Sequence, residues 1–307
     1  MSIVPAHKIA QGIYWTHSLT LVSGCTPVSK GCENCWAAVM ASRFDWGKGF
    51  AENGKWTGKV EPNYKVLKKL EKRVGSERKL KPKVFCIWND FFHPQIRYAF
   101  QLRALHAMYY LEQDVFLILT KRPEEIKNSA FSQGPFEDTD LSNVYLGVSV
   151  ESQKYIHRID ELIQNWPGKK FVSIEPCLSA VELSPEQLTA LDQVIIGGES
   201  GPKARPMQPD WARSIRDQCQ DAGVSYFLKQ RGQWLTAEEV SEYLGEDTPI
   251  LRDTWPSRIN RNIDRGRLQV VDNTTMCRVT KKDAGRLLDG RHWDQLTWNI
   301  EKGTDEH

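Results

Sequence analysis

The sequence predicts an α/β fold in which a parallel sheet curls into a partial or complete (β/α) barrel. Two observations lead to this prediction. Short runs of continuous apolar, β-rich sequence recur along the chain, as they do in strands buried on both faces of a parallel sheet. Amphipathic stretches of helical length separate the runs, and successive runs after the first begin about 24 to 32 residues apart, as expected for βα units.

The first predicted strand is "GIYWTHSLTLV", residues 12–22. Six further strands are predicted over residues 83–90, 115–121, 143–151, 169–176, 193–200 and 225–230. The amphipathic stretches between them predict helices over residues 96–113, 155–166 and 210–223. The last of these helices ends at Gly223, which suits the left-handed conformation of a residue that closes a helix.

The alternation of strands and helices stops after residue 234. The residues that follow are mixed in charge and carry no recognisable motif, although they include Trp255, Trp293, Trp298 and the stretch "PSRINRNIDRGR". We therefore predict a barrel over residues 1–234. Residues 235–307 are predicted to form a C-terminal accessory segment that packs on the barrel or shapes the substrate entrance.

Composition narrows the class of protein. The chain has 307 residues, a formal net charge of +2, 40% hydrophobic and 26% charged residues, which is ordinary for a globular protein. No run of 18 apolar residues and no signal-peptide pattern are found, so no membrane partner is expected. The odd number of cysteines, seven, argues against a secreted disulfide framework. We expect a cytoplasmic protein with reduced thiols.

Polar side chains stand where the predicted strands end. They are Asn89, Asp90, Thr120, Lys121, Ser149, Glu151, Ser173, Glu175, Glu199, Ser200, Lys229 and Gln230. The carboxyl ends of parallel strands open on one face, which is where active sites of such folds lie. A single polar strand end is explained equally well by contact with water. Six strands in succession favour a ligand-binding mouth.

Three cysteines lie close together in the stretch "SGCTPVSKGCENCWA", residues 23–37: Cys25, Cys32 and Cys35. A structural zinc site would need these thiols plus a remote ligand such as His17 or His93, because no second CxxC pair exists. Inert buried cysteines are a second interpretation. The third, which we favour, is a [4Fe–4S] cluster with three protein ligands, because such a cluster usually takes four and one iron would stay open to a cofactor or substrate.

At these residues the chain resembles the radical S-adenosylmethionine (SAM) superfamily, in which a three-cysteine loop follows the first strand of a TIM-like barrel. The usual superfamily spacing is three residues and then two, with an aromatic residue before the last cysteine. Here the first gap is six and Trp36 follows Cys35. The detailed motifs are similar to a phage- and prophage-associated branch that is distantly similar to spore photoproduct lyase. The matching segments are 24–37, 90–93, 119–123, 147–151, 173–176 and 197–207.

The resemblance implies a ligand set for the cofactors. Cys25, Cys32 and Cys35 would bind the [4Fe–4S] cluster, and the open iron would chelate SAM, whose reductive cleavage yields a 5′-deoxyadenosyl radical. An electron donor such as flavodoxin or ferredoxin would then be a partner. The remaining SAM contacts are expected from Asn89 and Asp90 for the amino group, Arg158 for the carboxylate, and Ser149 and Glu151 for the ribose hydroxyls. An ordinary solvated helix arginine is an equally good interpretation of Arg158.

Glu175, Glu199 and Lys121 are the candidate catalytic residues. A buried, unpaired acid is costly, so each glutamate must meet a cation, a sugar hydroxyl or the substrate. Lys121 is one of several cations at the strand ends, together with Arg122, Lys203, Arg205, Lys229 and Arg231. These cations suit an anionic substrate, or they balance the acids of the mouth. The glycines of "GGESG" are expected to let the chain approach a bound adenine or substrate closely.

The most basic part of the chain is residues 64–83, with nine Lys or Arg against two Glu. Such a run is usually a solvated helix face, but it is also typical of an arm that contacts phosphates, here through Lys68, Lys69, Lys72 and Arg73. Trp88 or Phe92 could stack on a base that has been flipped out of a duplex.

Taken with the resemblance, these features predict a radical SAM enzyme. Its expected substrate is a nucleobase, such as a hypermodified thymine in phage DNA. An isomerase or rearrangement reaction is expected, since it needs no net oxidant. The alternative is a non-catalytic, zinc-stabilised nucleic-acid-binding phage protein. Neither the oligomeric state nor the choice between a polymer and a free nucleotide can be inferred from the sequence.

Overall fold

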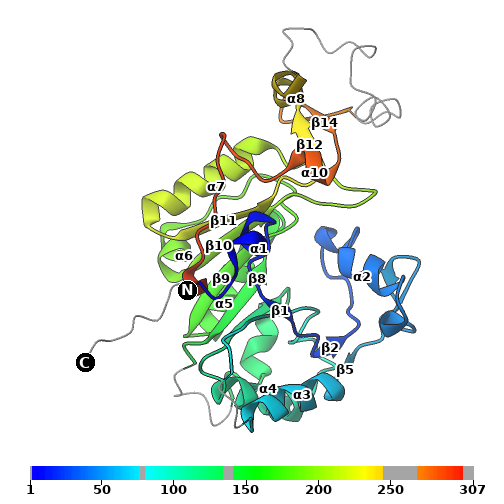
Figure 1. The fold of residues 1–307 in the computed structure, drawn as a ribbon, viewed down its shortest axis with the longest axis vertical. Coiled ribbons are helices and arrows are strands. Elements are labelled where there is room, and N and C mark those ends of the chain that lie inside the picture. The colour runs from blue at the N-terminus through cyan, green and yellow to red at the C-terminus, as the bar shows by residue number, and fades with distance from the viewer. Residues whose placement is uncertain (1, 77–79, 134–140, 245–267, 300–307) are drawn as a thin grey trace.

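A computed structural model describes residues 2–76, 80–133, 141–244 and 268–299. Its centre is a seven-stranded parallel sheet with the strand order β1-β6-β7-β8-β9-β10-β11 (Figure 1). The strands are β1 (His17–Ser18), β6 (Val84–Ile87), β7 (Val115–Thr120), β8 (Val144–Ser149), β9 (Lys169–Ile174), β10 (Gln193–Gly197) and β11 (Ser225–Gln230). Spatial order follows chain order, so the sheet winds in one direction. Among the described residues β1 and β11 remain its two edges, which makes the fold a partial barrel.

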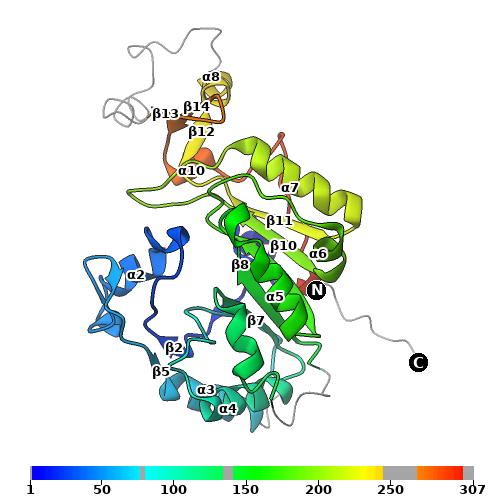
Figure 2. The same ribbon diagram turned by 180° about the vertical axis from the view of Figure 1, so that it is seen from behind.

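Helices cover the outer face of this curled sheet (Figures 1 and 2). They are α3 (Tyr64–Val74), α4 (Tyr98–Tyr109), α5 (His157–Asn165), α6 (Pro185–Ala190) and α7 (Pro209–Ala222). The helix α7 ends as predicted, because Gly223 has φ 71° and its N–H returns to the carbonyl of Gln220. None of the helices in the described ranges has both the length and the apolar character needed to cross a bilayer.

Both faces of the sheet are buried in apolar cores, which explains the continuous apolar runs. Outward-facing residues such as Ile118 and Ile174 pack against the helices. Inward-facing residues such as Leu117 and Phe171 pack instead against segments from the two ends of the chain, including Tyr14 and Trp298. A strand that meets apolar groups on both sides loses the alternating pattern of a half-exposed strand.

The prediction of a strand over residues 12–22 is wrong for most of that range. Only His17 and Ser18 pair with β6, and the chain then leaves the sheet so that β2 (Val22–Ser23) pairs with β5 (Glu61–Pro62). Leu19 and Leu21 are buried in the core without belonging to a strand, although the backbone N–H of Leu19 donates to the carbonyl of Cys86 in β6. Their burial gives this stretch its strand-like apolar sequence. The six other predicted strands are confirmed.

The part of the chain between β2 and β5 forms a small lobe beside the sheet. It contains the 3₁₀ turns η1 (Lys30–Cys32) and η2 (Asp45–Gly47), the helix α2 (Trp36–Ala41) and a hairpin of β3 (Ala51–Glu52) and β4 (Lys55–Trp56). Figure 1 shows α2 facing the carboxyl-terminal side of the sheet across a gap. The cysteine loop therefore lies at the predicted mouth.

After β11 the chain adds a second, three-stranded sheet in the order β12-β14-β13. Its elements are β12 (Trp234–Thr236), β13 (Leu268–Val271) and β14 (Thr274–Arg278), with the helices α8 (Ala237–Leu244) and α10 (Lys281–Ala284) beside them. The predicted accessory segment also includes Trp255 and residues 256–267, which lie outside the described residues.

The chain then returns to the barrel, and residues 286–298 complete its inner side. The guanidinium of Arg286 donates hydrogen bonds to the carbonyls of Leu228, Lys229 and Ile9. The indole of Trp298 donates to the carbonyl of Tyr14 at 3.0 Å and packs among inward-facing aromatic side chains of the sheet. Phe227 of β11 forms an isolated antiparallel bridge with Asp294, so this segment also covers an edge that would otherwise expose unpaired backbone groups.

The first part of the basic stretch 64–83 forms the amphipathic helix α3 (Tyr64–Val74), and residues 77–79 of the stretch lie outside the described residues. The lysines of α3, Lys65, Lys68, Lys69 and Lys72, are exposed. Arg73 is not available for phosphate, which corrects its sequence interpretation: its guanidinium makes a bidentate pair with the fully buried carboxylate of Asp114, at 2.6 and 2.7 Å. The same carboxylate accepts the backbone N–H of Lys83 at 2.9 Å. Arg73 therefore joins α3 to the sheet.

We expect Arg73→Met to lower the free energy of unfolding by about 3–5 kcal/mol, because it leaves the Asp114 carboxylate buried without its cation. Arg103→Met is the matched control, since Arg103 makes a similar pair with Glu71 on the exposed side of α3 and should cost less than about 1 kcal/mol. Urea denaturation measures both. An equal loss of unfolding free energy in the two variants would contradict the structural role of Arg73.

Candidate functional site

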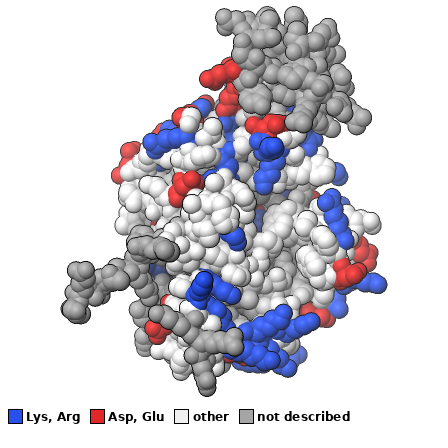
Figure 3. Space-filling view, in the orientation of Figure 1, with Lys and Arg blue, Asp and Glu red and all other residues white. Residues whose placement is uncertain are grey.

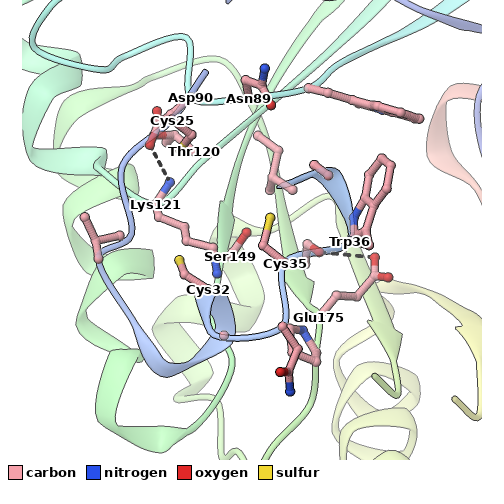
Figure 4. Close-up of a pocket in the computed structure, with 18 of the residues that line it drawn as sticks. Cys25, Cys32, Cys35, Trp36, Asn89, Asp90, Thr120, Lys121, Ser149 and Glu175 are labelled. Carbon is pink, nitrogen blue, oxygen red and sulfur yellow. Dashed lines mark hydrogen bonds between the residues drawn. The ribbon is translucent and has the colours of Figure 1, made fainter. Parts of the chain in front are cut away.

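A pocket of about 240 Å³ opens at the carboxyl-terminal ends of the strands, between the sheet and the cysteine loop (Figure 4). Six successive strands contribute side chains to its lining. These side chains are Asn89, Asp90, Thr120, Lys121, Ser149, Ser173, Glu175, Glu199, Lys229 and Gln230. The polar strand ends picked out in the sequence thus meet in one place, as expected for parallel strands.

All three clustered cysteines line this pocket. Cys32 ends η1, and Cys35 immediately precedes α2. Figure 4 shows the Cys32 sulfur beside the Lys121 side chain and the Cys35 sulfur between Lys121 and Trp36. All three are free thiols. The loop therefore presents three soft donors to one space, which is what a three-cysteine ligand set requires.

The surroundings shift the pKa values of Cys25 and Cys32 in opposite directions. Burial, with a smaller contribution from the Asp90 carboxylate, raises the pKa of Cys25 to about 11. Burial also acts to raise the pKa of Cys32, but the Lys121 ammonium and hydrogen bonds from the loop outweigh it, so this pKa lies below its ordinary value. Burial in turn lowers the pKa of Lys121 to about 8. The Lys121 ammonium thus stabilises the thiolate form of Cys32 relative to an ordinary thiol.

Glu151 lies directly behind the cysteine loop and is fully buried. Its carboxylate accepts a hydrogen bond from the Ser29 hydroxyl at 2.6 Å and from the Arg158 guanidinium at 3.0 Å, and it forms an ion pair with Lys121. A Cβ placed on Gly31 would lie 2.5 Å from this carboxylate, so only glycine allows the loop to pass so close.

The structure therefore places Glu151 and Arg158 outside the pocket lining. Arg158 also donates to the carbonyl of Ser149 at 2.7 Å and lies over the ring of Tyr155. It is a buried arginine rather than a solvated one. The contacts predicted for Glu151 with ribose hydroxyls and for Arg158 with a carboxylate stay predictions, whereas Ser149 does line the pocket.

Asp90 and Asn89 line the pocket and also fasten its rim. Asp90 accepts the Thr120 hydroxyl at 2.6 Å and the Arg122 guanidinium at 2.5 Å. Arg122 reaches on to the hydroxyl of Thr26, next to Cys25 in the loop. Asn89 adopts a left-handed backbone with φ 61°, and its amide donates to the carbonyl of Val22 at 2.8 Å. Both residues thus tie the start of the cysteine loop to β6 and β7.

A third anchor, which we call the latch, consists of Glu199, Arg205 and Asn34. The Glu199 carboxylate accepts two side-chain hydrogen bonds from Arg205, at 2.6 and 2.8 Å, and one from Asn34 at 3.1 Å. Arg205 also donates to the carbonyl of Lys30. The latch holds the cysteine loop to the segment after β10.

The glycines of "GGESG" allow close contacts within the protein. A Cβ on Gly198 would lie 2.3 Å from the carbonyl oxygen of Arg231, so this glycine permits close approach of two backbone segments. A Cβ on Gly197 would lie 3.2 Å from the Glu175 carboxylate. Gly198 also lines the pocket, and close approach to a bound adenine or substrate stays a prediction.

The last acid of the mouth, Glu175, pairs with Lys229. Their carboxylate and ammonium are 2.7 Å apart, and the Ser173 hydroxyl donates to the same carboxylate at 3.2 Å. The Lys229 ammonium also lies 5.7 Å from the ring centres of Tyr14 and Trp15. This polar pair therefore lies beside the aromatic rings of Tyr14 and Trp15.

Four tryptophans line the pocket: Trp15, Trp36, Trp56 and Trp88. The sequence analysis missed Trp15 and Trp56, because a lone tryptophan in a short strand or loop gives no periodic signal. Phe92 is the other residue predicted to stack on a base. That prediction is wrong, because Phe92 is buried in the core and does not line the pocket. Cys86, one of the four cysteines outside the loop cluster, also lines the pocket.

Within the described ranges, no group of three or more His, Cys, Asp or Glu side chains is arranged to hold a single metal ion. A cube-type cluster does not need such convergence, because each cysteine binds a different iron. The remote zinc ligands considered above are outside the pocket lining: the ring of His93 contacts the Thr26 hydroxyl, and His17 contacts the Thr16 hydroxyl. The donor set therefore suits a thiolate-bound cluster better than a mixed zinc site.

We expect Arg205→Met to open the latch and to speed hydrogen exchange at the hydrogen-bonded amides of Cys32 and Glu33 by roughly ten- to hundredfold, because charge-assisted hydrogen bonds are lost. Lys203→Met removes the same charge from an exposed side chain of the same loop and should leave the exchange unchanged. Mass spectrometry of peptides covering residues 29–36 measures both. Unchanged exchange in Arg205→Met would contradict the latch.

Comparison with known proteins finds one family. A family model described as "Protein of unknown function (DUF5131)" matches residues 10–297. The match covers nearly the whole chain, including the cysteine loop, every strand of the parallel sheet and the segment that completes its inner side. No curated protein and no solved structure matches the chain.

Proposed function

The chain belongs to the DUF5131 family of proteins of unknown function, and from its site we propose that it is a radical SAM enzyme. The observation that carries the proposal is that three thiols from one short loop face a single pocket at the carboxyl-terminal mouth of a parallel, barrel-like sheet. Cys25, Cys32 and Cys35 would hold a [4Fe–4S] cluster. The partial barrel is then of the radical SAM type, and the cytoplasm, where thiols stay reduced, is its proposed location.

The cofactors would supply the radical chemistry: cluster and SAM together would yield a 5′-deoxyadenosyl radical, with a donor such as flavodoxin or ferredoxin as the source of the electron. The chain supplies the ligands and the surroundings. Lys121 offsets negative charge at Cys32, and its own placement depends on Glu151. Because burial raises the pKa of Cys25, binding of a metal at this thiol would release a proton.

SAM would lie against the strand ends beside the loop. Asn89 and Asp90 are the proposed contacts for its amino group, and Ser149 for its ribose. Arg158 is held behind Glu151, so the cation that meets the SAM carboxylate is proposed to be Lys121, which lines the pocket. Charge-assisted contacts of this kind contribute about 1.5–3 kcal/mol each.

The proposed substrate is a nucleobase in DNA, such as thymine, and the proposed reaction is an isomerisation or rearrangement. Support comes from the exposed lysines of α3 and from the aromatic pocket lining. Figure 3 shows Lys and Arg side chains gathered at the bottom of the view, at the end of the molecule that α3 occupies in Figure 1. Clustered lysines contact phosphates without reading sequence, which suits an enzyme that must hold a strand while one base enters the pocket.

The cluster is tested by replacing each clustered cysteine with alanine. Protein purified without oxygen should be brown, with iron and sulfide, and single substitution of Cys25, Cys32 or Cys35 should remove most of both. Cys177→Ala and Cys219→Ala are the controls, because these thiols are buried in the core away from the pocket. Incubation with SAM and dithionite should give 5′-deoxyadenosine in the wild type and the controls only. Colourless protein that contains zinc would instead support the nucleic-acid-binding alternative.

The DNA partner is tested by changing Lys65, Lys68, Lys69 and Lys72 together to Gln. Affinity for DNA should fall and its dependence on salt should weaken, by about one unit of slope for each lysine that contacts a phosphate. A variant with Gln at Lys127, Lys154, Lys281 and Lys282 loses the same charge elsewhere and should keep the wild-type slope. Titration of a fluorescent duplex at several salt concentrations measures this. Equal slopes in the two variants would argue for a free nucleotide as substrate.

A further inference from the structure

The hydrophobic core accounts only in part for the four tryptophans of the pocket: Trp15 packs against the inner core, but none of the four is fully buried. Trp15, Trp56 and Trp88 are half-buried, and the Trp36 side chain is 47% exposed. The Trp88 ring packs edge-on against both Trp36, at 4.5 Å between ring centres, and Trp15, at 5.9 Å. Indoles normally contribute by burying a large apolar area, so a connected set left partly open to a pocket offers that area to a ligand.

Next to Trp15, at one end of the connected rings of Trp15, Trp88 and Trp36, a hydrogen-bond donor and a hydrogen-bond acceptor lie side by side. The ionised Glu175 carboxylate can only accept hydrogen bonds, whereas the Lys229 ammonium can only donate them. The two groups are 2.7 Å apart, both line the pocket, and Lys229 also lies over the ring of Trp15. A flat ligand that fits here must present a donor next to an acceptor on one edge.

We propose that Trp15, Trp36 and Trp88 form the walls of a nucleobase subsite and that Glu175 and Lys229 read one edge of the base. Nucleobases combine a planar face that stacks on indoles with adjacent N–H and carbonyl or ring-nitrogen groups. A sugar lacks the planar face, and a plain aromatic ring lacks the polar edge. The subsite rests on the proposed function for its role, because it would hold the substrate beside the cysteine loop.

Binding of free deoxynucleosides tests the subsite without any turnover. The full chain is titrated with thymidine, deoxycytidine, deoxyguanosine and deoxyadenosine, and quenching of tryptophan fluorescence is followed both without SAM and with SAM at saturation. We expect at least one deoxynucleoside to bind. Trp36→Ala should weaken that binding about five- to 150-fold, which is the usual effect of removing one stacking ring.

Trp46→Ala is the matched control, because Trp46 is also an exposed tryptophan of the same lobe but lies outside the pocket lining. It should leave the affinity unchanged. Glu175→Gln should change the order of preference among the four deoxynucleosides, because an amide can donate as well as accept. Circular dichroism and thermal unfolding check that each variant is folded, and Trp36 is exposed enough for its loss to be tolerated.

Three results would overturn the subsite: no quenching by any deoxynucleoside, equal losses in Trp36→Ala and Trp46→Ala, or binding of deoxyadenosine alone that SAM abolishes. The last would assign the tryptophans to the adenine of SAM. These failures are separate from failure of the proposed function, since iron content and SAM cleavage would be unaffected by them. Conversely, deoxynucleoside binding by a chain that takes up no iron would support the subsite and contradict the proposal of a radical SAM enzyme.

Discussion

The buried carboxylate of Glu151 is the group on which the geometry of the site depends. It is buried beneath the cysteine loop, and among the described residues its charge is compensated by Lys121 and Arg158, with a further hydrogen bond from the Ser29 hydroxyl of the loop. Losing one partner of a buried ion pair leaves a charge whose desolvation is not compensated. Movement of the loop away from Glu151 would break the Ser29 hydrogen bond, and Gly31 cannot be replaced without a collision. The buried carboxylate therefore helps to hold the loop that carries the cysteines.

The same pattern recurs around the mouth, where each acid has its own cation. Asp90 pairs with Arg122, Glu199 with Arg205, and Glu175 with Lys229. The cations that suggested an anionic substrate in the sequence are thus largely used in balancing these acids, so the mouth has little net charge to offer. Selectivity for a ligand must therefore come from shape, stacking and the direction of hydrogen bonds. Attraction of a charged polymer must come from the exposed lysines of α3, which lie apart from the mouth.

Much of this arrangement follows from the sequence, and the exceptions have physical causes. Six strands were predicted because burial on both faces leaves an unbroken apolar signature, and their polar ends were predicted to converge because parallel strands share a direction. The partners of individual charges were not predictable. Arg73 looks like its neighbouring lysines along the chain, yet it meets Asp114 across 41 positions, and Arg205 meets Lys30 across 175. Such pairs depend on the folded path of the chain. The same is true of the pocket positions of Trp15, which lies just before β1, and Trp56, which lies on β4 of the small lobe.

The segment 286–298 has a consequence for the way the protein is made. It fills the inner face of the sheet and covers the edge of β11, but it follows all seven strands of that sheet in the chain. While a ribosome is still translating this segment, inward-facing residues such as Leu117, Tyr145 and Phe171 lack the apolar contacts that Leu296 and Trp298 provide, and only the N-terminal segment with Val4 and Tyr14 is available to them. The inner core is therefore completed only after residue 298 has been translated. A chain that stalls before residue 286 is left with exposed apolar surface, which is a feature that chaperones bind and that promotes aggregation.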